Sequence, residues 1–307
     1  MQRQPPEPAS APGPGSAPEP VSHAKLTRES YHSSDTGSER DYFVYLPVGY
    51  ETERARSWPL LVVLHGDGER GDAKSDLDYL LKNGPLYEAW IQKRDLPFVI
   101  VAPQLPLYGR DQSVSYLQAR TRAEIPERLA DGVPPRPPEF PTPSPFSGAV
   151  ANADLPYGPE GPPDGWSKLE ADVVQIVDAV TRSHRVDPQR RYLTGISYGA
   201  FGAWYLASRH PDLFAALAPV VGWGHPDLMP PLARTDLPIW VFAGGRDTTI
   251  EAQYFYPGLA TLESLGHSRL RFTVEADMGH DVWARVYAGR DLYDWLLGFS
   301  QGAGRAP

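Results

Sequence analysis

Apolar residues between positions 41 and 299 fall into two alternating patterns: short continuous runs, and longer stretches with helical spacing. Several of the runs hold four to six apolar residues in succession, which is typical of strands that are covered on both faces. The runs predict seven β-strands, at residues 41–47, 59–66, 97–103, 191–197, 216–222, 239–245 and 269–275.

Helical spacing is clearest in residues 168–184, where the apolar residues form a single stripe. Residues 254–265 repeat the pattern and are followed by Gly266, a residue type that often ends helices. Residues 281–299 predict a last helix that closes the chain. Because strands and helices alternate, we expect an α/β fold in which a mostly parallel central sheet carries helices on both faces.

Proline is concentrated in two segments. Seven of the 34 prolines lie in residues 1–20 and twelve lie in residues 126–163. The first segment has no apolar periodicity, so we expect a disordered tail over residues 1–30. One domain over residues 31–300 and a disordered end over residues 301–307 would complete the chain.

The second proline-rich segment belongs to a stretch, residues 107–165, that interrupts the alternation of strands and helices. It has few apolar residues and only a weak helical pattern near residues 118–129. A loop of this length inside a compact domain is usually functional or disordered. We therefore keep two interpretations of this insertion, a cap over the functional site and a mobile surface excursion.

Composition narrows the possible partners. The net charge is −9 with no run of lysine or arginine, which argues against a nucleic-acid partner. The chain has no cysteine, which excludes disulfides, thiolate catalysis, zinc–thiolate sites and iron–sulfur clusters.

Hydropathy bears on the compartment. No apolar stretch approaches the roughly 20 residues that cross a bilayer, so we expect a soluble protein without a membrane span. Residues 1–20 lack the basic start and apolar stretch of a secretory signal. A cytoplasmic protein and an exported protein whose signal is absent from this chain both stay open, as does the oligomeric state.

The strongest chemical signal is Gly195-Ile196-Ser197-Tyr198-Gly199, a G-x-S-x-G pattern directly after a predicted strand and before a predicted helix. Small flanking residues allow the sharp turn that lifts a serine hydroxyl out of a sheet. The alternative is a chance glycine–serine turn, because the pattern alone is weak. The strand–turn–helix context favours Ser197 as a nucleophile.

A serine nucleophile needs a base, and the base needs an acid to orient it. His280 follows the last predicted strand across a short loop, so it fits the chain order serine, acid, histidine of doubly wound hydrolases. Asp247 follows the strand at residues 239–245, which makes it the predicted acid; Glu251 is the second choice. His225 is a weaker candidate for the base.

A glycine-rich loop after the strand at residues 59–66 could bind the oxyanion of a reaction intermediate. Its sequence, LHGDGERG, allows close approach of backbone N–H groups. In hydrolases of this type one donor comes from this loop and one from the residue after the serine, which predicts the amides of Asp67 and Tyr198. The loop lacks the Lys-Ser/Thr ending of a nucleotide-binding P-loop, and His65 is expected to support it structurally.

Five motifs of the chain resemble those of a known family. The motifs LHGDGERG, VAPQLP, GISYG, IWVFAGGRD and GHDVWARVY are similar to those of the α/β-hydrolase esterases, near the polyhydroxyalkanoate depolymerase, feruloyl esterase and dienelactone hydrolase groups and including predicted peptidases. The resemblance implies an α/β-hydrolase fold and a carboxylic ester hydrolase that uses Ser197, Asp247 and His280, with no metal and no organic cofactor. Two features depart from the family: the long insertion before Trp166, and Tyr198 where methionine is usual.

The sequence therefore predicts hydrolysis of short-chain or aromatic acyl esters, as small molecules or polymers, through an acyl-enzyme. Trp223 and Trp166 are the candidate residues of the substrate pocket. A serine peptidase of the same fold is the leading alternative. A non-catalytic relative that binds a ligand is the second, although no triad residue is missing from this chain.

Overall fold

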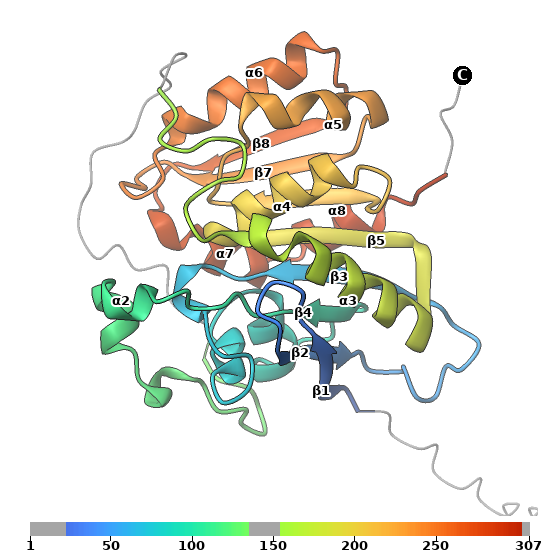
Figure 1. The fold of residues 1–307 in the computed structure, drawn as a ribbon. Helices are drawn as coiled ribbons and strands as arrows, with labels where there is room; N and C mark the ends of the chain where they lie inside the picture. Colours follow the sequence, from blue (N-terminus) through green and yellow to red (C-terminus); the bar gives the residue numbers. More distant parts are fainter. Residues whose placement is uncertain (1–22, 135–153, 303–307) are drawn as a thin grey trace, which may run out of the picture.

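The computed structural model describes residues 23–134 and 154–302. Its centre is an eight-stranded sheet with the order β1-β2-β4-β3-β5-β6-β7-β8 (Figure 1). Strands β1 and β2 pair antiparallel, as do β2 and β4, and every other neighbouring pair is parallel. The strands are β1 Lys25–His32, β2 Glu39–Leu46, β3 Trp58–Leu64, β4 Val99–Ala102, β5 Val186–Ile196, β6 Ala216–Val220, β7 Ile239–Gly244 and β8 Leu270–Glu275.

Helices cover both faces of this sheet. In Figure 1, α3 and α4 lie in front of the strands and α7 and α8 lie behind them. The α-helices of the described residues are α1 Gly84–Leu86, α2 Ser115–Ala119, α3 Glu170–Ser183, α4 Tyr198–Arg209, α5 Met229–Thr235, α6 Tyr256–Ser264, α7 Trp283–Ala288 and α8 Asp291–Leu297. Short 3-10 or π turns join several of them, including Asp67–Glu69 and His280–Val282.

Strand β3 shows why the central runs are apolar throughout. All seven of its residues are buried. Leu60 and Val62 pack into one hydrophobic cluster together with α3 to α6, whereas Leu61 and Val63 pack into a second cluster with α7 and α8. The predicted mostly parallel sheet with helices on both faces is confirmed.

Two predicted boundaries are wrong. Residues 25–30, assigned to a disordered tail, belong to β1, whose alternation of exposed and half-buried residues gives no continuous apolar run. The predicted single helix at residues 281–299 is divided at Gly289, which has extended backbone angles. Arg94 donates hydrogen bonds to the carbonyl groups of Tyr287 and Ala288, so a distant side chain caps α7 there.

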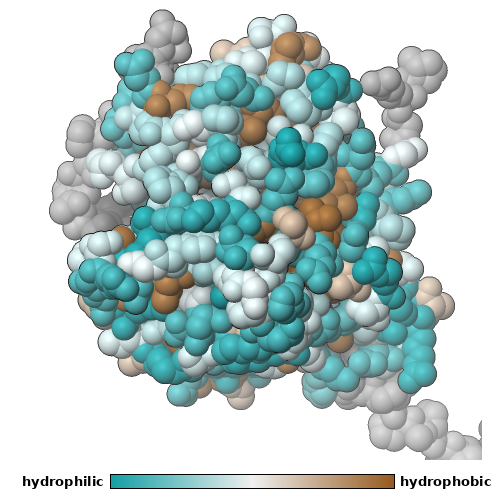
Figure 2. All heavy atoms as spheres, viewed as in Figure 1, coloured by the Kyte–Doolittle hydropathy of each residue, from teal (hydrophilic) through white to brown (hydrophobic). Residues whose placement is uncertain are grey.

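The proline-rich insertion is described on both sides of residues 135–153, which lie outside the described residues, as do residues 1–22 and 303–307. Its first part holds α2 and the short turns Arg110–Gln112 and Arg122–Glu124. On the face shown in Figure 2, hydrophilic residues cover most of the surface and hydrophobic residues lie in separate small groups. Within the described ranges, no helix has the length and apolar character needed to span a bilayer.

Candidate active site

Ser197 lies at the sharp turn between β5 and α4. Its φ of 52° and ψ of −113° are strained for a residue with a side chain. Its amide donates to the carbonyl of Val220 at 2.9 Å, which ties the turn to the neighbouring strand. A Cβ atom on Gly195 would lie 2.1 Å from the carbonyl oxygen of Gly199, and one on Gly199 would lie 1.9 Å from that of Leu64. The turn therefore requires both glycines of the motif.

The side chains of Ser197, His280 and Asp247 lie in one line of hydrogen bonds. His280 Nε2 is 3.1 Å from Ser197 Oγ, and His280 Nδ1 is 2.7 Å from Asp247 Oδ2. Since carboxylates only accept hydrogen bonds, Nδ1 carries the proton and Nε2 is free to accept one from the serine. The arrangement can remove the hydroxyl proton of Ser197.

Asp247 is fixed from its other side. Its Oδ1 accepts from the amides of Thr249 at 2.8 Å and Ile250 at 2.9 Å. Its side chain is fully buried next to His280, where a charged carboxylate can stabilise an imidazolium ring. Gly244 at the end of β7 allows this approach, because a Cβ atom there would lie 2.1 Å from the carbonyl oxygen of Gly279.

The alternative acid and base lie elsewhere, as does Asp277, which is three residues before His280 in the sequence. Asp277 is held by Arg285 at 2.7 Å, and Glu251 accepts from Gln253 at 2.9 Å. His225 contacts the amide of Asp227. None of these three side chains is hydrogen-bonded to Ser197 or His280 in the described part of the chain, so Asp247 and His280 remain the assignments that the geometry favours.

Residues 66–69, in the loop after β3, line the same pocket as Ser197. The amides of Asp67 and Tyr198 have no hydrogen-bond acceptor among the described residues. Tyr198 opens α4, whose first amides have no partner within the helix. Both amides are therefore available to a ligand in the pocket.

His65 supports this loop from beneath. Its Nε2 accepts from the amide of Leu105 at 2.8 Å, and its Nδ1 donates to the carbonyl of Gly66 at 2.6 Å. Burial lowers the pKa of His65 to about 3, so the ring is neutral at ordinary pH.

Trp166 does not lie in the substrate pocket, so its prediction as a pocket residue is wrong. Its ring packs edge-on against His65 with centroids 5.0 Å apart, and its indole N–H donates to the carbonyl of His65 at 3.2 Å. Gly202 of α4 makes room for it, since a Cβ atom there would lie 2.4 Å from the Cβ of Trp166. Trp166 therefore supports the loop from below.

Above Ser197 the pocket has a volume of about 690 Å³, and Trp223 is part of its wall. Three other aromatic rings surround Trp223: Phe201 edge-on at 5.0 Å, Tyr157 stacked at 6.1 Å and Tyr254 tilted at 6.4 Å between centroids. Sequence analysis missed Tyr157, because nothing in the irregular insertion indicates which of its residues reaches the site. The insertion therefore contributes to the pocket wall.

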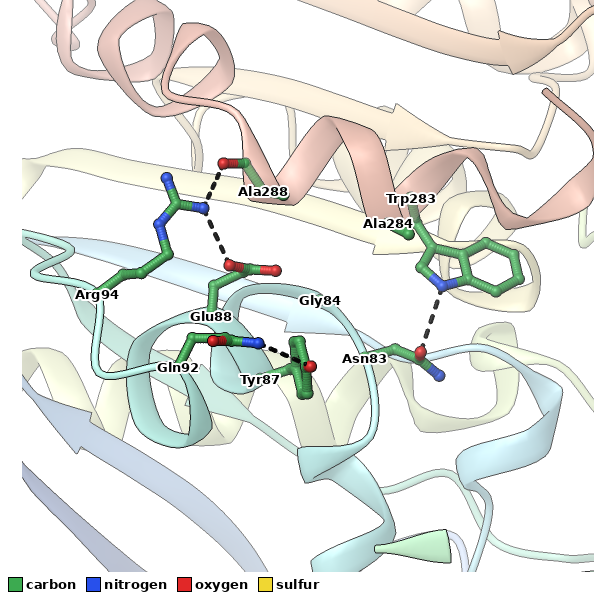
Figure 3. Close-up of a pocket in the computed structure, with 9 residues that line it drawn as sticks. All are labelled: Asn83, Gly84, Tyr87, Glu88, Gln92, Arg94, Trp283, Ala284 and Ala288. Atoms are coloured by element: carbon green, nitrogen blue, oxygen red, sulfur yellow. Dashed lines mark hydrogen bonds and ion pairs between the residues drawn. The ribbon is translucent and has the colours of Figure 1, made fainter. Parts of the chain in front are cut away.

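A second pocket, of about 160 Å³, adjoins the first and shares Asn83 and Trp283 with it. Figure 3 shows the indole N–H of Trp283 donating to Asn83 Oδ1, at 3.3 Å. The Trp283 ring also stands edge-on to His280, with centroids 5.2 Å apart. At the far end of this pocket, Arg94 binds Glu88 at 2.9 Å (Figure 3). Trp283 and Asn83 thus separate the two cavities.

Metal ligands are not gathered at either pocket. Across residues 23–134 and 154–302, no cluster of three or more histidine, aspartate or glutamate side chains is placed to hold a metal ion.

Sequence comparisons point to esterases and depolymerases. Residues 161–226, which include Ser197, match the family model described as Esterase PHB depolymerase. A poly(3-hydroxyalkanoate) depolymerase C from Paucimonas lemoignei is 44% identical over 50 residues, which are 16% of this chain and 12% of that protein. The chain thus matches only a small part of this relative, and Asp247 and His280 lie outside the family match.

Similar solved structures cover nearly the whole chain. A thermostable esterase is similar with a TM-score of 0.59 at 22% identity, over 90% of this chain and 63% of that one. A ferulic acid esterase is similar with a TM-score of 0.52 at 18% identity, over 90% of this chain and 97% of that one. Together with the sheet order and the position of Ser197, these similarities establish the α/β-hydrolase fold.

Proposed function

We propose that this chain is a serine hydrolase that cleaves carboxylic esters through an acyl-enzyme. The observation that carries the proposal is the position of His280, which joins the strained Ser197 to the buried Asp247 at 3.1 and 2.7 Å. The esterase and depolymerase relatives support the same class of reaction. The catalytic roles of the three residues are part of the proposal.

In the proposed reaction, Ser197 Oγ attacks the ester carbonyl carbon while its proton passes to His280 Nε2. The carbonyl oxygen becomes an oxyanion that accepts hydrogen bonds from the amides of Asp67 and Tyr198. Asp247 stabilises the imidazolium form of His280. When the tetrahedral intermediate collapses, His280 Nε2 returns the proton to the leaving alcohol and the acyl group stays on Ser197.

The second half of the reaction uses the same groups. A water molecule loses its proton to His280 Nε2 and attacks the acyl carbon, and a second oxyanion forms beside the same two amides. Its collapse releases the carboxylic acid and returns the proton to Ser197 Oγ. No step requires a metal ion or an organic cofactor.

The pocket favours short-chain or aromatic acyl groups. Its volume lies within the range of small-molecule sites, and the accessible rings of Tyr157 and Tyr254, which pack on the buried Trp223, provide apolar surface in the pocket that holds Ser197. An aromatic acyl group could stack there, while a small aliphatic one would leave part of the wall unfilled. Esters of small molecules and chain ends of polyesters both present such groups.

Hydrolysis of p-nitrophenyl esters from acetate to dodecanoate tests the proposal. We expect turnover that declines beyond butyrate, and Ser197→Ala should lower kcat by at least about 10³-fold. Ser264→Ala, on the exposed end of α6, is the matched control and should behave as the parent protein. Turnover that survives in Ser197→Ala would refute the proposal. Folded protein that cleaves only peptides would indicate a serine peptidase, and protein that cleaves neither would indicate a ligand-binding relative.

A further inference from the structure

The carboxylate of Asp67 is bound by residues from two parts of the chain. Arg70 Nε, three residues further along the loop, donates to Oδ1. Arg110 Nη2 donates to Oδ2 at 2.8 Å, and the hydroxyl of Tyr116 donates to the same oxygen. Arg110 and Tyr116 both belong to the insertion. The insertion therefore binds the loop that contains Asp67, whose amide has no acceptor among the described residues.

This ion pair is largely removed from water. The side chain of Asp67 is 7% exposed, that of Arg70 is 0% exposed and that of Arg110 is 20% exposed. Burial alone would raise the pKa of Asp67, but the hydrogen bonds and charges of Arg110 and Arg70 hold it below its usual value. A charged carboxylate at this position needs its partners, since an unpaired buried charge is costly.

The same two arginines also contact Tyr198. The Arg70 guanidinium lies 4.8 Å from the centre of the Tyr198 ring and the Arg110 guanidinium lies 5.2 Å from it, both within cation–π range. Tyr198 supplies the other available amide. Tyr198, which stands where the similar motifs usually have methionine, thus packs against Arg110 of the insertion.

We infer that Arg110 is a positioning residue for the oxyanion site: through its ion pair with Asp67 and its contact with Tyr198, it fixes the two amides relative to one another. The inference rests on the proposed function, because it assigns those amides to the oxyanion. Donors at such a site act when they lie about 2.7–3.1 Å from the oxyanion, and they have to be held within about 0.5 Å of that geometry. Because Arg110 contacts the side chains of both Asp67 and Tyr198, it restricts the distance between their two amides.

Arg120 adds a second attachment of the insertion to the loop. Its Nη1 donates to the carbonyl groups of Arg70 and Gly68, and its Nη2 binds Asp76 at 3.0 Å. These bonds fix the backbone of the loop but leave the carboxylate of Asp67 to Arg70, Arg110 and Tyr116. Replacing Arg110 should therefore displace the amides of Asp67 and Tyr198 while Arg120 still holds the rest of the loop.

The test compares Arg110→Gln, Arg110→Lys and Tyr116→Phe with Arg122→Gln as the matched control. Arg122 lies in the same insertion and is exposed. Its guanidinium is 3.3 Å from the carboxylate of Asp78, and neither residue lines the pocket. We expect Arg110→Gln to lower kcat for p-nitrophenyl butyrate by about tenfold to a hundredfold, with KM changed by less than about twofold. Arg110→Lys should recover part of this loss, because an ammonium can pair with Asp67 but is a poor substitute for a planar guanidinium over a ring. Tyr116→Phe removes one hydroxyl from an exposed ring, so it should fold and show a smaller loss of kcat in the same direction.

A second readout separates this inference from the proposed function. Diisopropyl fluorophosphate phosphorylates an activated serine, and its phosphoryl oxygen uses the same donors, so the labelling rate of Ser197 should fall in Arg110→Gln in parallel with kcat. Equal labelling and equal kcat in the parent and Arg110→Gln, with both folded by circular dichroism, would overturn the inference. If the parent protein is labelled at Ser197 but cleaves no ester, the proposed function fails, and the labelling rates alone decide the role of Arg110.

Discussion

Tyr157 lies parallel to Trp223, with the two ring centroids 6.1 Å apart and an angle of 10° between the planes. Tyr157 belongs to the insertion, whereas Trp223 follows β6 at the carboxyl edge of the sheet. Tyr157 is also edge-on to Phe201 on α4, at 5.8 Å. The insertion therefore contributes the accessible ring of Tyr157 to the aromatic wall of the pocket that holds Ser197.

Replacing Tyr157 with alanine should therefore weaken turnover of aromatic esters selectively. One ring contact contributes about 1 kcal/mol, so kcat/KM for p-nitrophenyl cinnamate should fall about fivefold, while kcat/KM for the acetate changes little. Tyr157→Phe keeps the ring and is the control. An equal loss on acetate and cinnamate would place Tyr157 outside the acyl site.

Gly199→Ala should prevent the strained turn at Ser197. The added Cβ atom would lie 1.9 Å from the carbonyl oxygen of Leu64, a backbone atom of the central strand β3 that cannot move without disturbing the sheet. We expect the variant either to remain insoluble or to unfold at least about 5 °C below the parent protein in a thermal melt. Gly158→Ala is the matched control, since its Cβ atom would meet nothing within 4 Å. Equal melting temperatures for Gly199→Ala and the parent would contradict this geometry.

Protonation of His65 should destabilise the fold at low pH. Burial lowers its pKa from 6.5 to about 3, so the unfolded chain binds a proton there at a higher pH than the folded protein does. The stability that the neutral ring contributes is complete above pH 6.5 and is lost as the pH falls from 6.5 towards 3. His65 should therefore contribute at most about 1.4 kcal/mol per pH unit to the decline of the free energy of unfolding.

Urea unfolding of the parent protein and His65→Gln between pH 7.5 and 4 measures that slope. Burial also lowers the pKa of His267, which is present in both proteins and contributes equally to both curves. The free energy of unfolding should therefore decline less steeply in His65→Gln. Parallel curves would show that His65 does not carry the predicted proton linkage.

Arg94→Gln should lower stability and leave catalysis intact. Arg94 binds Glu88, whose side chain is 8% exposed, and donates to the carbonyl groups at the end of α7. Loss of the cation should lower the free energy of unfolding by about 2 kcal/mol, because Glu88 would lose one charged partner and the carbonyl groups at the end of α7 would lose their donor. The kcat of the folded variant should match the parent, since the second pocket lies beyond Trp283 and Asn83. A large loss of kcat without a loss of stability would assign this pocket to the reaction.

The sequence predicted the fold where local pattern decides it. The apolar run in β3 is buried on both faces, so its composition alone identifies a central strand. Strand β1 has one buried residue, Tyr31, and lies at the edge of the sheet, so its residues carry no such signal. The break at Gly289 depends on Arg94, which lies almost two hundred positions earlier in the chain. Contacts between residues so far apart in the sequence cannot be predicted from the spacing of apolar residues.

The candidate site divides in the same way. Ser197, Asp247 and His280 each follow a strand of the parallel sheet, and topology alone brings such positions to one edge. Arg110 and Tyr116 lie in an irregular segment without periodicity, so their sequence positions do not predict which way their side chains point. The prediction for Trp166 was wrong because a tryptophan near a motif can either line a pocket or pack beneath a loop, and the sequence does not distinguish the two.

Trapping of the acyl-enzyme shows whether Ser197 is the nucleophile. The protein would be mixed with p-nitrophenyl butyrate, quenched in acid within milliseconds, digested and analysed by mass spectrometry. We expect one butyryl group on the peptide that contains Ser197, formed as fast as p-nitrophenol is first released, and none in Ser197→Ala. A burst of p-nitrophenol equal to the enzyme concentration with no acyl group on Ser197, or turnover that persists in Ser197→Ala, would refute the acyl-enzyme mechanism.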